Sequence, residues 1–457
     1  MSSVPLSETV ASLIPRARTE LAELVSFASV ADERQFPRSE SQKAAAWIVA
    51  ALREEGFEEV ALLDTPDGTQ SVYGVLPGPA AAPTVLLYAH YDVQPPLDES
   101  AWLSPPFELT ERDGRWYGRG AADCKGGLVM HLTALRALRE HGGVPLNVKV
   151  IVEGSEEQGT GGLERYAEAH PDLLTADAIV IGDTGNFRVG LPTVTSSLRG
   201  MVLTEVRVAT LAGNLHSGQF GGAAPDALAA LIQMLATLRD ASGATTVDGL
   251  DGSGEWSGLA YEEADFRRDA KVLDGVELVG GGAVADRLWA RPAVTVLGID
   301  APPVVGATPS VQAEAGALVS VRVPPGVDAA KAAEALETHL RAAAPWGAKV
   351  EVTRRGSGQP FAADTGSPAY ASMAEAMREA YGQEMAVVGQ GGSIPLCNTL
   401  ATLYPSAEIL LIGLSEPEAQ IHAVNESVSP EELERMTLTE ALFLRRYAAA
   451  HSAGQGV

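Results

Sequence analysis

The sequence is poor in cysteine, in long apolar runs and in basic residues. Two cysteines, Cys124 and Cys397, cannot form a disulfide framework, so we expect a reducing, cytoplasmic location. No apolar run approaches the roughly 18–20 residues of a transmembrane helix, and no basic-then-apolar signal peptide opens the chain. Lysine and arginine total 33 against 59 acidic residues, a formal net charge of −26. Nucleic acid and anionic membranes are therefore not expected as partners.

The sequence carries the signals of an α/β domain that is interrupted by a second domain. Helix and strand signals alternate over residues 1–192 and again over 360–457, which predicts a mostly parallel sheet flanked by helices. Over residues 193–359 the order changes to β-α-β-β-α-β, the order of ferredoxin-like domains. We therefore expect one α/β domain in two sequence parts, with a ferredoxin-like domain inserted between them.

Four of the expected strands are apolar throughout, which is typical of strands buried on both faces of a parallel sheet. Residue types that bind metals stand at or soon after their carboxyl ends, where sites form in open α/β sheets. Thr84–His90 is followed by Asp92, 147–153 by Glu156 and Glu157, Ala178–Asp183 ends in Asp183, and Glu408–Leu414 precedes His422.

The adjacent carboxylates of Glu156 and Glu157 repel each other unless a cation lies nearby. A metal that binds one of them leaves the other to work as a base. The Gly-rich loop 118–127 lacks the spacing of a phosphate-binding loop, but it carries Asp123 at the start of a helix. Asp123 is interpreted either as a helix cap or, together with the other ligand types, as a carboxylate that bridges two cations.

Two imidazoles and three carboxylates suit two divalent cations that share one aspartate, each with an open position. Zn²⁺ fits this set, and Mn²⁺ or Co²⁺ fit nearly as well. His90 and Asp92 are expected two residues apart on one strand with their side chains on the same side, so that Asp92 orients His90. Glu156 is expected to act as the general base. Each residue also has a simpler interpretation, such as a His-Asp turn or a solvated loop histidine. The expected metal ligands are His90, Asp123, Glu157, Asp183 and His422.

These segments resemble peptidase family M20, and within it the dipeptidase branch that includes carnosine dipeptidases. The resemblance covers nearly the whole chain and is carried by ordered motifs. They are Leu-Tyr-Ala-His-Tyr-Asp-Val-Gln-Pro (87–95), Gly-Arg-Gly-Ala-Ala-Asp-Cys-Lys-Gly (118–126), Glu-Gly-Ser-Glu-Glu-Gln-Gly (153–159), Asn-Leu-His-Ser-Gly-Gln-Phe-Gly-Gly (214–222), Arg-Leu-Trp-Ala-Arg-Pro (287–292), Gly-Gly-Ser-Ile-Pro (391–395) and Ile-His-Ala-Val-Asn-Glu (421–426).

The resemblance implies roles that the residues alone do not. His216 would enter the site of a partner subunit and hold the scissile carbonyl oxygen, so the inserted domain becomes a lid and dimerisation domain of a homodimer. Arg322 and Ser393 would bind the carboxylate of the substrate. The chain departs from the family where Cys124 replaces a second aspartate, a change that leaves the bridging ligand intact. It departs again in 306–310, where Thr308 is the candidate substrate contact.

We therefore expect a dinuclear metal-dependent hydrolase that cleaves dipeptides or short peptides with metal-activated water. One alternative is an N-acyl-amino-acid amidohydrolase, such as a deacetylase or desuccinylase. The other is a non-catalytic relative that binds metal or peptide, a class in which the base Glu156 or a ligand is expected to be lost. Here none is missing.

Overall fold

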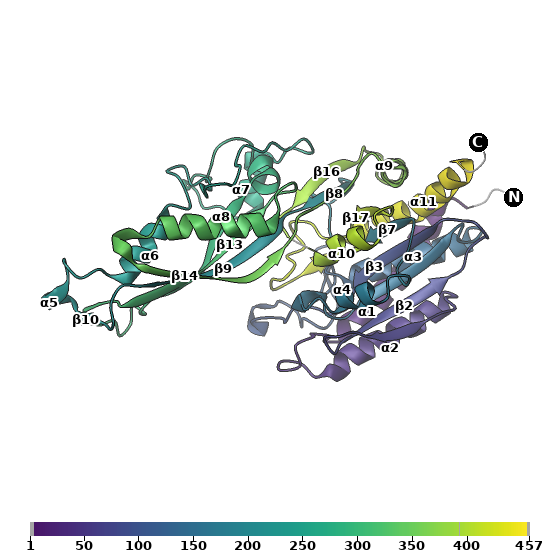
Figure 1. The fold of residues 1–457 in the computed structure, drawn as a ribbon. Helices are drawn as coiled ribbons and strands as arrows, with labels where there is room; N and C mark the ends of the chain where they lie inside the picture. The colour runs from purple at the N-terminus through teal and green to yellow at the C-terminus, as the bar shows by residue number, and fades with distance from the viewer. Residues whose placement is uncertain (1–3, 393, 455–457) are drawn as a thin grey trace. The chain divides into compact units, whose positions relative to one another are not determined.

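The computed structural model describes residues 4–392 and 394–454, which form two compact units (Figure 1). The first unit contains Met1–Ser196, Ala363–Val388 and Leu396–Val457, and the second contains Ser197–Ala362 and Gly389–Pro395. The domain boundaries expected at residues 193 and 360 stay a prediction. Within the described ranges, no helix combines the length and the apolar character that a membrane span requires.

The first unit is built on a sheet whose four central strands are parallel (Figure 1). Its strand order is β1-β2-β6-β3-β7-β17-β8, with antiparallel pairing only toward the edges. The mixed α/β fold with a mostly parallel sheet is therefore confirmed. The strands are β1 (Ala61–Asp64), β2 (Gln70–Leu76), β3 (Thr84–His90), β6 (Asn147–Glu153), β7 (Ala178–Ile181), β8 (Thr193–Leu198) and β17 (Glu408–Leu411), and β16 (Ala386–Gln390) also pairs with β8.

The central strands are buried on both faces, as their continuous apolar sequences predict. Val85 and Leu87 of β3 belong to the main core, while Leu86 and Tyr88, which alternate with them, are fully buried outside that cluster. The main core also takes side chains from helices that pack on one another. The helices of this unit are α1 (Leu6–Ser26), α2 (Arg38–Glu54), α3 (Lys125–Glu140), α4 (Gly162–Ala169), α9 (Pro368–Tyr381), α10 (Pro395–Leu403) and α11 (Pro430–Gly454).

A small three-stranded sheet brings two distant loops of this unit together. β5 (Arg115–Tyr117) pairs with β4 (Thr110–Arg112) on one side and with β18 (Ser427–Val428) on the other. The Gly-rich loop that follows β5 therefore lies beside the loop that precedes β18. These are the segments that carry Asp123 and His422.

The second unit is a four-stranded antiparallel sheet with order β11-β13-β9-β14 and helices α6 and α8 packed on it (Figure 1). Its core consists of alternate strand residues such as Val202 and Val206 together with apolar helix residues. The order of its elements agrees with the β-α-β-β-α-β pattern. They are β9 (Gly200–Ala209), α6 (Ala227–Ala236), β11 (Ala293–Asp300), β13 (Glu314–Val323), α8 (Ala329–Ala342) and β14 (Lys349–Gly358), with β10 (Leu215–His216), α5 (Ser217–Phe220), α7 (Glu263–Asp269), β12 (Ser310–Val311) and β15 (Phe361–Ala362) as short additions.

A buried ion pair ties α3 to α11 beneath the sheet of the first unit. His131 Nδ1 lies 2.7 Å from Glu440 Oε2, and His131 Nε2 lies 3.1 Å from the backbone oxygen of Tyr88. Both charged side chains are buried. Burial alone would lower the pKa of His131, but the carboxylate of Glu440 outweighs it and the pKa is raised. No role was expected for this histidine, because a single histidine on a helix gives no sign of a distant partner.

Replacing His131 by Asn should destabilise the first unit by about 3–5 kcal/mol near pH 6, because Glu440 is then buried without a counter-charge. A histidine whose pKa is raised in the folded state contributes its full stabilisation below the unfolded pKa of roughly 6.5. This stabilisation is lost as the pH rises through the folded-state pKa. The difference in the free energy of unfolding between wild type and variant should therefore shrink at alkaline pH. Urea unfolding at several pH values measures it, and His170→Asn, at an exposed histidine, is the control. A deficit that grows with pH would contradict the pairing.

Candidate metal centre

His90 and Asp92 lie together although only His90 is part of a strand. β3 ends at His90, so the expectation that both side chains project from one strand is wrong. The chain turns after His90 and places Asp92 Oδ1 3.5 Å and the Asp92 backbone oxygen 3.0 Å from His90 Nδ1. Both residues are fully buried. With Nδ1 held by these oxygens, His90 Nε2 is the nitrogen available to a cation.

Asp92 also holds the turn that carries the two adjacent glutamates. Its Oδ1 accepts a hydrogen bond from the Glu156 amide at 3.1 Å, and its Oδ2 accepts one from the Glu157 amide at 3.0 Å. These amides open a single 3₁₀ turn, Glu156–Gln158. One buried carboxylate therefore fixes both the imidazole of His90 and the start of the turn that follows β6.

Asp123 stands between two groups of ligand-type side chains. Its Oδ1 lies 3.0 Å from His90 Nε2, and its Oδ2 lies 2.9 Å from His422 Nε2. His90 Nε2 is also 3.2 Å from Asp183 Oδ1, and His422 Nε2 is 3.2 Å from Glu157 Oε2. One oxygen of Asp123 thus faces the pair His90 and Asp183, and the other faces the pair Glu157 and His422. A carboxylate that bridges two cations needs this geometry.

The donor chemistry of both groups fits divalent cations. Each group offers imidazole nitrogen and carboxylate oxygen whose ligand atoms lie within 4.8 Å of one another. Burial raises the pKa of Asp183 to about 6, which shows how poorly this pocket tolerates unpaired negative charge. Cations would compensate the crowded carboxylates directly. All five ligands expected from the sequence are brought together within the first unit.

Glu156 belongs to neither ligand group. Burial, followed by the negative charge of Asp183, raises the pKa of Glu156 to about 9. Its carboxyl therefore stands close enough to the ligands to sense their charge without being one of them. Bound cations would act in the opposite direction and stabilise the carboxylate form. A carboxyl group beside a metal site, but outside its ligand groups, is suited to accept and return a proton.

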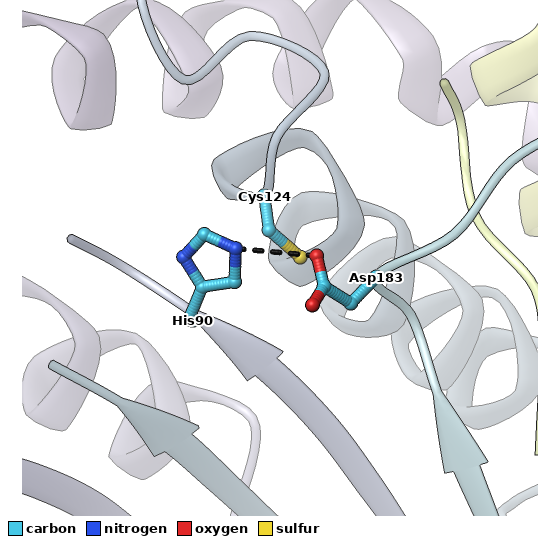
Figure 2. Close-up of side chains that lie close together, drawn as sticks. All are labelled: His90, Cys124 and Asp183. Atoms are coloured by element: carbon cyan, nitrogen blue, oxygen red, sulfur yellow. Dashed lines mark hydrogen bonds and ion pairs between the residues drawn. The ribbon is translucent and has the colours of Figure 1, made fainter. Parts of the chain in front are cut away.

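The thiol of Cys124 lies within the group of His90 and Asp183. Figure 2 shows its sulfur beside the His90–Asp183 pair, and the three ligand-type atoms lie within 4.8 Å of one another. The Cys124 thiol donates a hydrogen bond to the Gly182 backbone oxygen at 3.1 Å, and burial raises its pKa well above the usual value. Its sulfur therefore lies beside the expected ligands of the site. The sequence indicated that this position is not the bridging ligand, but not that its sulfur approaches His90.

Glu426 organises the loop of Asp123 and was not expected to act. Its fully buried carboxylate accepts hydrogen bonds from the amides of Gly120, Ala122 and Asp123 at 3.0–3.1 Å and from Arg119 Nη1 at 2.8 Å. It therefore ties the loop that carries His422 to the Gly-rich loop. In the sequence, the only sign of this role was its position in the motif 421–426, four residues after His422.

A second unexpected contact involves Gln94. Its side-chain nitrogen donates a hydrogen bond of 2.8 Å to Glu157 Oε2. The glutamate is thereby held on the side that faces His422. Gln94, like Glu426, lies within one of the family motifs, but nothing in the sequence indicated its role.

The remaining expected site residues belong to the second unit or lie outside the described residues. His216 is exposed in β10, and its Nδ1 accepts a hydrogen bond from the Gly218 amide at 3.1 Å. It pairs with Ser310 of β12, two residues after the exposed Thr308. Arg322 is half-buried on β13. Ser393 lies outside the described residues.

Comparison with known proteins finds a matching family model and relatives that are named dipeptidases. The family model described as peptidase family M20/M25/M40 matches residues 86–446. The chain is 47% identical over 432 residues to a cysteinylglycine-S-conjugate dipeptidase of Corynebacterium striatum, covering 94% of each chain. It is 27% identical over 391 residues to human Beta-Ala-His dipeptidase, covering 80% of this chain and 75% of the relative.

Solved structures agree with these relatives. Human carnosine dipeptidase 1 superposes with a TM-score of 0.81 at 25% identity, covering 97% of this chain and 98% of that one. The resemblance inferred from the motifs is confirmed: this chain belongs to peptidase family M20/M25/M40, and its relatives of 47% and 27% identity are named dipeptidases.

Proposed function

We propose that this protein is a dinuclear metallodipeptidase, with Zn²⁺ as the first metal to test and Mn²⁺ or Co²⁺ as the others. The observation that carries the proposal is the position of Asp123, one oxygen of which faces His90 while the other faces His422. Cations bound there would supply Lewis acidity for the peptide carbonyl and for the attacking water. The names of the relatives support dipeptides as the substrate class.

The side chains then divide the remaining work. Glu156, outside both ligand groups, takes the proton of the attacking water and delivers it to the leaving amine. His216 accepts at Nδ1 from Gly218, so its proton sits on Nε2, and that N–H is a donor for the carbonyl oxygen as negative charge develops. Arg322 binds the carboxylate of the substrate through its planar fork of donors. Ser393 is proposed as a second contact to the same group.

Substrate comparison on the metal-loaded protein tests this proposal. Because a relative of 47% identity is named for cysteinylglycine conjugates, Cys-Gly and its S-conjugates are the first dipeptides to assay, with Ala-Ala and β-Ala-His beside them. Dipeptides should turn over faster than N-acetyl and N-succinyl amino acids. Turnover of the acyl compounds alone would assign the protein to the amidohydrolases instead. Metal binding without turnover of either class would identify a binding protein.

We also propose a homodimer in the cytoplasm. Strand β11 is the edge of its sheet and exposes three apolar side chains, Val296, Leu297 and Ile299, at 39%, 55% and 48%. An unpaired edge of this kind favours pairing with another chain, and a second copy is the partner that family resemblance implies. The two cysteines are buried free thiols, which supports a reducing compartment.

Mixing two inactive variants should restore activity if His216 acts in the site of its partner. His216→Ala and Glu156→Gln should each be inactive alone. In a mixed dimer, the His216→Ala subunit keeps its base and receives the intact histidine of its partner. The purified mixed dimer should then show about half of wild-type activity, because one of its two sites is complete. Co-expression with two different tags and assay of the doubly purified dimer measures this. Mixed dimers without activity would contradict a role in trans.

A further inference from the structure

Two arginines of the second unit, Arg199 and Arg322, lie close together. Arg199 directly precedes β9, and the next residues, Gly200 and Met201, pair with Val323 and Arg322 of β13. Arg199 and Arg322 thus stand at the same end of one strand ladder. Burial, followed by the positive charge of Arg322, lowers the pKa of Arg199 to about 10. Among the described residues, neither guanidinium has an acidic partner.

Arg199 also packs against the loop that contains Gln390 and Gly391. Its amide donates to the Gln390 backbone oxygen at 3.1 Å, and a Cβ added to Gly391 would lie 2.8 Å from Arg199 Nη2. Glycine at 391 therefore leaves the room that the guanidinium occupies. The Nε and Nη1 atoms of Arg199 are buried, and no acceptor for them exists among the described residues.

Such an arrangement is costly unless an anion completes it. Buried donors without acceptors lose their hydration, and two nearby cations repel each other. Other arginines of this unit avoid both costs: Arg291 bonds to Asp286, and Arg355 pairs with Glu205. A carboxylate would relieve both costs for Arg199 and Arg322, since guanidinium forks match its two oxygens.

We propose that Arg199 joins Arg322 in binding the C-terminal carboxylate of the substrate, and that Arg199 makes a free C-terminus a requirement. This inference rests on the proposed dipeptidase function and deepens it. Arg322 alone was expected to hold that group. Arg199 would add a second, less hydrated cation whose unmet donors are already oriented before substrate arrives.

The test compares each dipeptide with its C-terminal amide on Arg199→Met and Arg199→Lys. For the free dipeptide, Arg199→Met should raise KM about 10- to 100-fold with kcat little changed, the size expected for losing a charged hydrogen bond. Cleavage of the amide should stay as slow as in wild type. Arg199→Lys, which keeps the charge without the fork, should recover part of the lost affinity. Arg354→Met, at a half-exposed arginine 3.8 Å from Glu337, is the matched control.

The outcomes separate this inference from the function on which it rests. Wild-type protein that cleaves no dipeptide contradicts the proposed function. Wild-type cleavage with an unchanged KM in Arg199→Met contradicts only the role of Arg199, as does an equal loss for acid and amide, which would mark a structural residue. Should Arg199→Met fail to fold, Arg199→Lys decides: a KM that rises for the dipeptide alone supports the role, and an unchanged KM overturns it.

Discussion

Replacing Glu156 by Gln should lower kcat for dipeptides by about 10²- to 10⁴-fold while the metal content stays unchanged. Glutamine keeps the size of the side chain but cannot accept the proton of the attacking water. Glu156 lies outside both ligand groups, so its replacement removes no metal ligand. Steady-state kinetics, together with metal analysis of the same preparation, measures both quantities.

The neighbouring residue provides a control at the same turn. Glu157 Oε2 lies 3.2 Å from His422 Nε2 and belongs to a ligand group, so Glu157→Gln should lose metal as well as activity. Two variants of identical chemistry, one residue apart, should thus differ in metal content. If Glu156→Gln retained near-normal turnover, or if it lost metal as Glu157→Gln does, the division of labour between the two glutamates would be wrong.

Replacing Asp123 by Asn should lower activity at least about 100-fold and reduce the bound metal below two ions per chain. An amide offers one acceptor oxygen, whereas the two groups need an oxygen each on opposite sides of the same side chain. Metal stoichiometry after dialysis against a weak chelator, followed by reconstitution and assay, measures the effect.

The exposed carboxylate Asp172, in a loop of the same unit, is the control for Asp123. Asp172→Asn removes one negative charge from the unit without touching either ligand group, so both metal content and kcat should remain as in wild type. An Asp123→Asn protein that bound two ions with wild-type affinity would contradict the bridging role of Asp123.

The sequence was most informative where strand order alone determines position. Parallel strands end at a common edge, so apolar runs that finish near His90, Glu157 and Asp183 predicted that these side chains meet, and in the structure they do. The fold class followed from the same runs, because continuous apolar strands alternating with helices leave few other arrangements.

What the sequence did not reveal depends on loops and on distant partners. Asp92 was expected to orient His90, but its bonds to the amides of Glu156 and Glu157 depend on the path of two turns. Arg199 offered no signal, since an arginine between two strands is usually solvated. His216 and Arg322 gained roles only from the family resemblance, and those roles remain proposals.

The bond between Glu426 and the Gly-rich loop has a consequence for biosynthesis. Arg119 and Glu426 are 307 positions apart in the sequence, yet they meet in one buried pair that also fixes the amide of Asp123. A growing polypeptide emerges from the ribosome with its N-terminal part first. When His90, Asp123, Glu157 and Asp183 have emerged, the segment with His422 and Glu426 has not. At the proposed site, metal capture with full affinity would therefore come late in the synthesis of each molecule, and it would report that nearly the entire chain has been made and folded.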